Sequence, residues 1–178
     1  MFPRLNRMLL VPIAPMAIIF PFHGCMTGSE IPNELSGSIV DENGTAEAGA
    51  KVSLYRSDRI PGMGSDPGPV AFAQTDAKGG FRFKKMTRGT YTLLAEKSGA
   101  RAFQDSVIFA NTSYDLGADT LKAPGALVGR ILLAKPDDPR LALVQVLGTD
   151  IYVNVDSAGV FNLTDMAEGR YRIRVLAD

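Results

Sequence analysis

Hydrophobic and polar residues alternate with a period of two in several stretches of the chain. Residues 91–96 (YTLLAE) place Tyr, Leu and Ala at every second position, and residues 170–175 (RYRIRV) alternate Arg with Tyr, Ile and Val. A period of two is typical of a β-strand with one face in a core and the other in water. After the opening segment, no ten-residue stretch has the spacing of an amphipathic helix. The pattern therefore predicts an all-β protein.

The first half of the chain is predicted to contain seven short strands separated by turns. They are expected near Leu35–Val40, Lys51–Arg56, Val70–Thr75, Gly80–Lys84, Gly89–Lys97, Ala102–Phe109 and Tyr114–Leu121. Seven short strands of this kind are typical of a β-sandwich. The alternation assigns six side chains to its core, namely Val52, Leu54, Phe81, Phe83, Tyr91 and Leu93.

The same unit occurs twice along the chain. The segment that starts at Thr75 (TDAKGGFRFKKMTRGTYTLLAEK) recurs from Val155 (VDSAGVFNLTDMAEGRYRIRVLA) at an offset of 80 residues. Upstream, residues 35–39 (LSGSI) match residues 127–131 (LVGRI) at an offset of 92 residues. The difference of 12 residues predicts an insertion in the first repeat. It falls at Ser57–Pro69, where prolines and glycines mark a loop.

The second repeat is predicted to be incomplete. By the 80-residue offset, Asp178 corresponds to Ser98 of the first repeat, so no residues match the last two predicted strands. A sandwich without these strands has unpaired backbone donors and acceptors at its sheet edges. We therefore expect either that the chain is a fragment of a longer protein or that something else fills the gap.

Four motifs in the first repeat resemble those of a known family. They are GSIV at residue 37, AGAKVSL at residue 48, TDxxGxFxF at residue 75 and GxYxL at residue 89. Together they resemble the carboxypeptidase regulatory-like domain, a transthyretin-like sandwich, over Leu35–Leu121 and again over Leu127–Ala177. The resemblance implies tandem transthyretin-like or Ig-like β-sandwiches, the first complete with about seven strands. Members of this family are usually noncatalytic accessories, so no catalytic residues are implied.

The opening segment has the parts of a secretory signal. Two arginines precede an apolar run from Met8 to Phe22, and no acidic residue appears before Glu30. The run is shorter than a membrane span and contains three prolines, which argues against a retained transmembrane helix. The tetrapeptide FHGC at residues 22–25 resembles a bacterial lipobox, which implies cleavage before Cys25 and acylation of that residue, with palmitate as a typical acyl chain. The alternative is an ordinary signal peptide with a chance cysteine.

The lipobox resemblance also implies a location. Met26 follows the cysteine where some lipoproteins have aspartate, which implies sorting to the outer membrane of a Gram-negative bacterium. The chain is then expected to divide into a lipoprotein signal peptide (1–24), a tether (25–34), the first sandwich repeat (35–122) and a partial second repeat (123–178). Its first expected partner is the membrane, through the lipid anchor.

The residue types restrict the chemistry that the mature chain can perform. Cleavage before Cys25 removes His23, which is the one histidine, and acylation occupies the one cysteine. Ser-His-Asp catalysis, Cys-His catalysis and His-ligated catalytic zinc therefore lack essential residues. We expect no cofactor and no metal. Carboxylate chemistry survives this exclusion, because paired acidic residues can act as acid and base.

Charge gives no reason to expect a nucleic-acid partner. The chain has 19 basic and 19 acidic residues, whereas nucleic-acid binding calls for clustered Lys and Arg. The densest basic patch (Arg82, Lys84, Lys85, Arg88) is interpreted as the solvated face of a strand. The sequences DENG at residue 41, DAKG at residue 76 and DSAG at residue 156 predict aspartates that support turns.

These observations favour a noncatalytic, membrane-anchored surface module that spaces or presents a binding partner or a downstream domain. The insertion loop is a possible partner-binding site through Arg59, Met63 and Asp66, because long loops specific to one copy often carry function. The partner, protein or glycan, is not identified.

Two alternatives remain open. One is a carbohydrate-binding accessory module. It would have to use Tyr55, Tyr114 and Tyr152, because the chain has no Trp and its alternation places the other two tyrosines in the core. The other is a hydrolase that depends on carboxylates such as Asp58 and Asp66 in the insertion loop.

Overall fold

The computed structural model describes residues 33–64, 67–134 and 138–177. Residues 31–178 form one compact unit. In the described residues the regular structure is β-strands, with one short 3₁₀ turn at Pro139–Leu141. The prediction of an all-β protein is confirmed.

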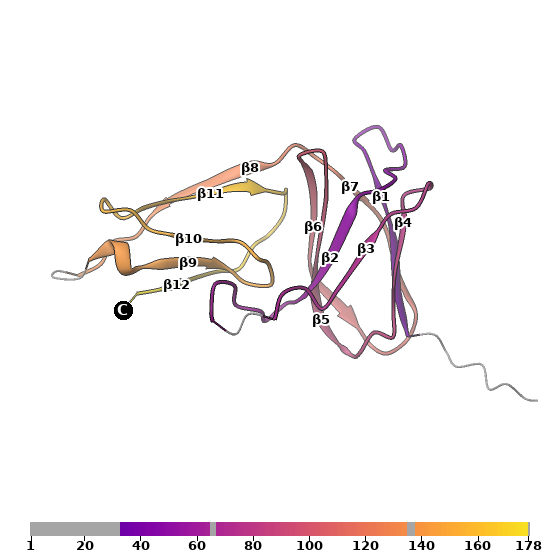
Figure 1. The fold of residues 1–178 in the computed structure, drawn as a ribbon, viewed down its shortest axis with the longest axis horizontal. Coiled ribbons are helices and arrows are strands. Elements are labelled where there is room, and N and C mark those ends of the chain that lie inside the picture. The colour runs from indigo at the N-terminus through magenta and orange to yellow at the C-terminus, as the bar shows by residue number, and fades with distance from the viewer. Residues whose placement is uncertain (1–32, 65–66, 135–137, 178) are drawn as a thin grey trace, which may run out of the picture. The chain divides into compact units, whose positions relative to one another are not determined.

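The first repeat is a sandwich of a three-stranded and a four-stranded sheet (Figure 1). The three-stranded sheet has the order β4-β1-β7, and the four-stranded sheet has the order β3-β2-β5-β6. The strands are β1 (Glu34–Val40), β2 (Lys51–Arg56), β3 (Ala71–Gln74), β4 (Gly80–Lys84), β5 (Gly89–Lys97), β6 (Ala100–Phe109) and β7 (Tyr114–Thr120). β7 runs parallel to β1, and the other pairings are antiparallel. The seven predicted strands are thus confirmed to within two residues at each end.

The core of the first repeat lies between its two sheets. All six side chains predicted for this core are buried, with Val52 and Leu54 having no exposed surface. Strand β6 adds Ala102, Val107 and Phe109 to the same cluster. The cluster therefore depends on both sheets and on the edge strand of the larger one.

The second repeat contains five strands, also in two sheets. One sheet pairs β11 with β8, and the other has the order β10-β9-β12. The strands are β8 (Gly125–Arg130), β9 (Leu143–Val146), β10 (Tyr152–Asn154), β11 (Val160–Met166) and β12 (Ile173–Leu176). A smaller core of Val144, Val146, Val155, Phe161 and Leu163, with Ala142 and Met166, lies between the sheets.

The two repeats share one strand register. Gly37 pairs with Phe81 across β1 and β4, and Gly129 pairs with Phe161 across β8 and β11. Val52 pairs with Ala95 across β2 and β5, just as Val144 pairs with Val175 across β9 and β12. Strands β8 to β12 are therefore the counterparts of β1 to β5. The counterparts of β6 and β7 do not occur among the described residues, as the offset predicted.

The 12-residue insertion lies between β2 and β3 of the first repeat. In the second repeat, residues 147–151 connect the corresponding strands β9 and β10. The predicted position of the insertion, Ser57–Pro69, lies inside the longer connection. The expected domain boundaries (35–122 and 123–178) stay predictions, and the signal peptide and tether (1–24 and 25–34) fall almost entirely outside the described residues.

Candidate functional site

The residue expected to carry the lipid, Cys25, lies outside the described residues, as does Asp66 of the insertion loop. Among the residues that the structure describes, no helix has the length and hydropathy required to cross a membrane. The candidate sites that can be described are the aspartate turns, an open depression on the first repeat and the insertion loop.

The three aspartates predicted to support turns do so with the same geometry. Asp76 Oδ1 accepts hydrogen bonds from the backbone amides of Lys78 (2.8 Å) and Gly80 (2.9 Å). Asp41 and Asp156 likewise accept from the amides two and four residues further on. These bonds hold the pKa of the Asp41 and Asp76 carboxyls below the usual range. The turn interpretation is confirmed for all three.

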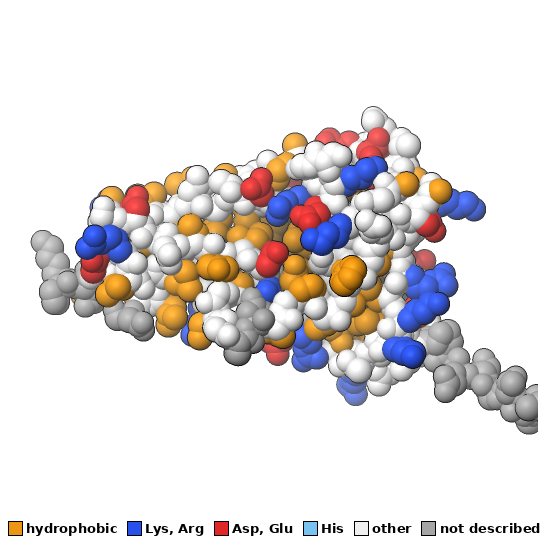
Figure 2. All heavy atoms as spheres, in the orientation of Figure 1, with side chains coloured by type: hydrophobic (Ala, Val, Ile, Leu, Met, Phe, Trp, Pro, Cys, Tyr) orange, Lys and Arg blue, Asp and Glu red, His pale blue; other side chains and the backbone are white. Residues whose placement is uncertain are grey.

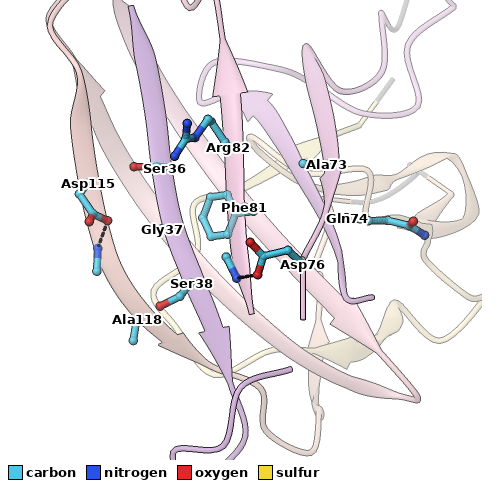
Figure 3. Close-up of a pocket in the computed structure, with 12 residues that line it drawn as sticks. Ser36, Gly37, Ser38, Ala73, Gln74, Asp76, Phe81, Arg82, Asp115 and Ala118 are labelled. Atoms are coloured by element: carbon cyan, nitrogen blue, oxygen red, sulfur yellow. Dashed lines mark hydrogen bonds between the residues drawn. The ribbon is translucent and has the colours of Figure 1, made fainter. Parts of the chain in front are cut away.

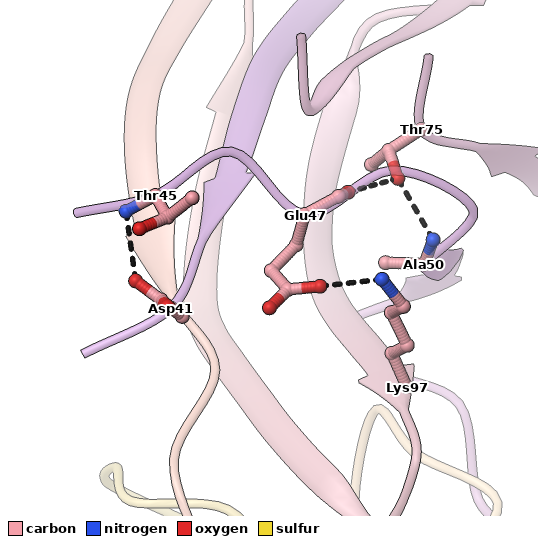
Figure 4. A network of polar contacts seen from close by, with 6 residues as sticks. All are labelled: Asp41, Thr45, Glu47, Ala50, Thr75 and Lys97. Atoms are coloured by element: carbon pink, nitrogen blue, oxygen red, sulfur yellow. Dashed lines mark hydrogen bonds and ion pairs between the residues drawn. The ribbon is translucent and has the colours of Figure 1, made fainter. Parts of the chain in front are cut away.

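A polar network beside the first of these turns joins the loop 41–50 to the four-stranded sheet (Figure 4). The Thr75 hydroxyl donates to the Glu47 carbonyl (2.5 Å) and accepts from the Ala50 amide (2.8 Å). Lys97 Nζ lies 2.5 Å from Glu47 Oε2. Each polar group here has a partner within the protein, so the network serves the fold.

A depression of about 540 Å³ lies over β1, β4 and β7 of the first repeat (Figure 3). Its two carboxylates are engaged locally, because Asp76 accepts from Gly80 N and Asp115 accepts from Gly117 N at 3.0 Å. Arg82, at its rim, forms an ion pair with Glu34 at 2.7 Å. The lining thus offers hydroxyl, amide and backbone groups, while both of its carboxylates are already bonded to nearby backbone amides.

Nowhere in residues 33–64, 67–134 and 138–177 do three or more His, Cys, Asp or Glu side chains gather as they would around a metal ion. The carboxylate of Asp58, proposed for a hydrolase, is exposed and lies 3.5 Å from Arg56. All four side chains of the basic patch are exposed, but only Arg82 and Lys84 lie on strand β4, and Lys85 and Arg88 follow its end. Figure 2 shows acidic and basic side chains on the same face of the first repeat.

The tyrosines divide into buried and exposed groups. Tyr91 is a core residue, and its hydroxyl donates to the Thr87 carbonyl at 2.7 Å. Tyr171 makes the matching bond to Ala167, also at 2.7 Å, but it is only half-buried. Of the three tyrosines considered for sugar stacking, Tyr55 is buried, whereas Tyr114 and Tyr152 are exposed.

The insertion loop contacts the second repeat. Arg59 is 8% exposed, and its guanidinium donates to the Thr149 carbonyl. Its own carbonyl accepts from the Gly148 amide at 2.8 Å. Two residues further along, the Pro61 carbonyl accepts from Gln145 Nε2 at 2.6 Å. Of the other possible partner-binding residues, Met63 is 43% exposed and lines a hollow together with Ile60 and Pro67.

An apolar cluster completes this contact. Tyr55, Leu94 and Phe103 of the first repeat pack with Ala167 of the second, and the Tyr171 ring stacks on Phe103 with centroids 4.1 Å apart. Burial raises the pKa of Tyr55 and of Tyr171 to about 12, and the Asp150 carboxylate adds to the shift at Tyr55.

Arg172 adds a further polar contact to the inter-repeat interface. Its Nη2 donates to the Ser57 carbonyl at 2.5 Å and lies 3.5 Å from Asp105 Oδ1. We call this set of contacts the inter-repeat interface. The first repeat contributes Tyr55, Ser57, Arg59, Pro61, Leu94, Phe103 and Asp105. The second repeat contributes Gln145, Gly148, Thr149, Ala167, Tyr171 and Arg172. The sequence did not predict it, because no local pattern records contacts between residues that lie 67 to 115 positions apart.

Comparison with solved structures finds weak likenesses. One is a type II cohesin–X-dockerin complex from Acetivibrio cellulolyticus, with a TM-score of 0.38, 20% identity, and coverage of 61% of this chain and 65% of that chain. Another is a streptococcal ancillary pilin, with a TM-score of 0.36, 12% identity, and coverage of 83% and 54%. This chain thus spans less than two thirds of either. At TM-scores below 0.5 these likenesses identify neither a partner nor a role.

A comparison with curated protein sequences finds no match. A comparison with protein families does find one. Residues 34–119, which contain β1 to β6 and all but the last residue of β7, match the family described as the carboxypeptidase regulatory-like domain. This match confirms, for the first repeat, the resemblance to the carboxypeptidase regulatory-like domain that the four motifs indicated.

Proposed function

We propose that this chain is a noncatalytic surface module, anchored through a lipid on Cys25, that spaces or presents a binding partner or another domain. The observation that carries the proposal is the inter-repeat interface. In this interface Arg59 and Pro61 of the insertion loop form hydrogen bonds with Thr149 and Gln145 of the second repeat. The two repeats then act as one body, which is what a spacer requires.

The physical chemistry of the interface supports a stiff connection. The guanidinium carbon of Arg59 lies 4.8 Å from the centre of the Tyr55 ring, while its N–H groups bond to Thr149. Gln145 is completely buried, and a buried hydrogen bond such as the one to Pro61 is costly to break. Hinge motion between the repeats would have to break these hydrogen bonds and separate the apolar cluster that packs beside them.

The anchoring part of the proposal rests on the sequence. The basic start, the apolar run and the FHGC tetrapeptide support acylation of Cys25. Two or more acyl chains hold a protein firmly at a membrane, since each buried methylene contributes about 0.8 kcal/mol. Met26 supports the outer membrane of a Gram-negative bacterium as the location. A protein or a glycan remains the proposed partner class.

Two measurements test the proposal. Metabolic labelling with a fatty acid should mark the wild type and leave the Cys25→Ser variant unmarked, and equal labelling of both would rule out the anchor.

The spacer role is tested in a Cys25→Ser background, which has no other cysteine. Spin labels at Lys78→Cys and Ser157→Cys, both in exposed turns of different repeats, should give one narrow distance distribution by pulsed electron resonance. A broad distribution would contradict a rigid spacer.

A further inference from the structure

The basic patch lies at the end of the first repeat where β1 begins and β4 ends (Figure 1). It consists of four exposed side chains, Arg82, Lys84, Lys85 and Arg88. Lys84 pairs with Glu34, the first residue of β1, across the β1–β4 ladder. The Met86 amide also donates to the Asn33 carbonyl at 3.0 Å. The basic patch is therefore held beside the point where the chain enters the first repeat.

The fold does not require positive charge at these four positions. By the 80-residue offset, their counterparts in the second repeat are Asn162, Thr164, Asp165 and Glu168. β11 pairs with β8 in the same register in which β4 pairs with β1. Lys85 and its counterpart Asp165 even share one backbone conformation, with φ of 57°. The second repeat builds the same turn from neutral and acidic residues, so the charge of the first repeat calls for another explanation.

Two exposed apolar side chains lie at the same end. β6 ends at Phe109 and β7 begins at Tyr114, and the start of β7 lies beside the start of β1. Ile108, next to the end of β6, is 71% exposed, and Tyr114 is 53% exposed. Cations beside exposed apolar and aromatic side chains are typical of a surface that meets the headgroups of a bilayer.

The acidic side chains near the basic patch are largely paired. The Glu34 side chain is 16% exposed and lies 2.7 Å from Arg82, and Asp58 lies 3.5 Å from Arg56. The turns at the opposite end of the first repeat, residues 41–49 and 75–79, contain one lysine and four acidic residues, namely Asp41, Glu42, Glu47 and Asp76. The first repeat is thus positive where β1 begins and negative where β1 ends.

The basic patch is also close to the proposed lipid anchor. Glu34 follows Cys25 by nine residues, and nine residues span at most about 30 Å even when fully extended. A protein held through Cys25 therefore keeps this end of the first repeat near the bilayer. Lys and Arg side chains are attracted to anionic headgroups over roughly one Debye length, about 8 Å in physiological salt.

We propose that the basic patch, together with Ile108 and Tyr114, binds the phosphate headgroups of anionic lipids in the membrane that holds the chain. This inference deepens the proposed function and rests on its anchoring part, because it adds a second membrane contact and an orientation. With the basic patch on the bilayer, the strands of the first repeat rise from the surface. The link from β7 to β8 then lies at the far end, as a spacer requires.

Vesicle binding tests this contact without the acyl chains. The protein is produced from residue 26, which omits the apolar run and Cys25 and retains the compact unit 31–178. Vesicles of equal parts phosphatidylglycerol and phosphatidylcholine should bind it saturably in a flotation assay. Vesicles of phosphatidylcholine alone should bind it at least about tenfold more weakly. Raising the salt from about 0.1 M to about 1 M shortens the Debye length from about 10 Å to about 3 Å and should release the protein.

Two triple variants with the same net charge locate the contact. The first carries Lys84→Gln, Lys85→Gln and Arg88→Gln. Its affinity for the phosphatidylglycerol vesicles should fall at least about tenfold, because three cations leave the contact. The second carries Lys51→Gln, Lys78→Gln and Arg170→Gln, three exposed cations on other surfaces. Its affinity should stay within about threefold of the unmodified protein.

Single tryptophans give an independent readout, because the chain has none of its own. Tyr114→Trp places a reporter in the proposed contact. Tyr152→Trp places one on the second repeat at a matched site, since the two tyrosines are 53% and 52% exposed. The phosphatidylglycerol vesicles should shift the emission of Tyr114→Trp to shorter wavelength, as burial of the ring at the headgroups requires, and leave Tyr152→Trp unchanged.

Several outcomes would overturn the proposal. They are absent binding to the phosphatidylglycerol vesicles, equal binding to both kinds of vesicle, equal affinities of the two triple variants, and a spectral shift at Tyr152→Trp without one at Tyr114→Trp. Tighter binding to duplex DNA than to vesicles in the same buffer, lost in the first triple variant, would assign the basic patch to nucleic acid instead. The protein in these measurements lacks Cys25, so their failure is distinguishable from a failure of fatty-acid labelling, which tests the anchor itself.

Discussion

Phe81 faces Gly37 across the β1–β4 ladder, and its ring fills the space where a side chain at residue 37 would begin. A β-carbon placed on Gly37 would lie 2.7 Å from Phe81 Cζ and 3.1 Å from the Gly117 carbonyl oxygen. The second repeat preserves the pairing, with a β-carbon on Gly129 2.3 Å from Phe161 Cζ. An aromatic ring opposite a strand glycine is a recognised way of pinning strand register.

The Gly37→Ala variant should therefore be destabilised. The added methyl group forces the Phe81 ring or the Gly117 backbone to shift, and overpacking of this kind costs about 1–3 kcal/mol. Urea denaturation measures the loss in unfolding free energy. Gly64→Ala is the matched control, since nothing lies within 4 Å of its β-carbon position. A change at Gly37 no larger than at Gly64 would contradict the close contact.

Phe81→Ala should lower the unfolding free energy by about 3–5 kcal/mol, because it removes a buried ring and leaves a cavity. Phe72→Ala removes the same atoms from a side chain that is 75% exposed, so its effect should stay below about 1 kcal/mol. Both values come from chemical denaturation followed by circular dichroism. Similar losses for the two variants would mean that Phe81 does not belong to the core.

Asp119→Asn should raise the melting temperature at pH 7. Burial raises the pKa of Asp119, and its Oδ2 has no hydrogen-bond partner within the described structure. Folding thus favours the protonated carboxyl, so the wild type gains stability as the pH falls through this raised pKa. The difference in melting temperature between the variant and the wild type should therefore shrink towards about pH 4.

Asp76→Asn provides a control with the opposite sign. Hydrogen bonds from the Gly80 and Lys78 amides lower the pKa of Asp76, so its contribution to stability is present at neutral pH and is lost as the pH falls through that lowered pKa. Thermal melts are recorded for both variants between pH 3 and about pH 7. At neutral pH the melting temperature should be above that of the wild type for Asp119→Asn and below it for Asp76→Asn. The same direction for both would contradict the assignment.

Arg59→Ala should destabilise the protein by about 1–3 kcal/mol, because the buried Thr149 carbonyl loses a charged donor. It should also broaden the spin-label distance distribution between the repeats. Arg82→Ala removes an arginine whose side chain is 60% exposed and paired at the surface, so it should cost no more than about 1 kcal/mol. If Arg59→Ala leaves both stability and the distance distribution unchanged, the loop does not hold the repeats together.

The period of two was sufficient to predict the sandwich core, because each strand presents alternate residues to one side regardless of its neighbours. It was less accurate at the start of β6, which begins at Ala100 and not at Ala102. Ser98 and Gly99 both have positive φ, at 50° and 84°, so a tight two-residue turn lets pairing begin at once between Lys97 and Ala100.

The roles of the insertion-loop residues could not be predicted in the same way. Arg59 has the sequence context of an exposed loop, yet it is buried because a turn near residue 149 packs against it. Tyr171 occupies the repeat position of the core residue Tyr91, but it also stacks on Phe103 of the other repeat. Such contacts follow from how two folded units meet, and no periodicity within either unit encodes them.

The insertion between β2 and β3 makes the two halves of this duplication unequal in a directional way. The longer connection belongs to the first repeat and receives the short β9–β10 turn of the second, where Gly148 approaches so closely that a β-carbon there would lie 2.5 Å from the Thr92 hydroxyl. If the order of the repeats were exchanged in the gene, the short turn would take the place of the longer connection, and the longer connection would take the place of the short turn. The two repeats therefore have different roles in the interface: the first supplies the long loop, and the second supplies the short turn that contacts it.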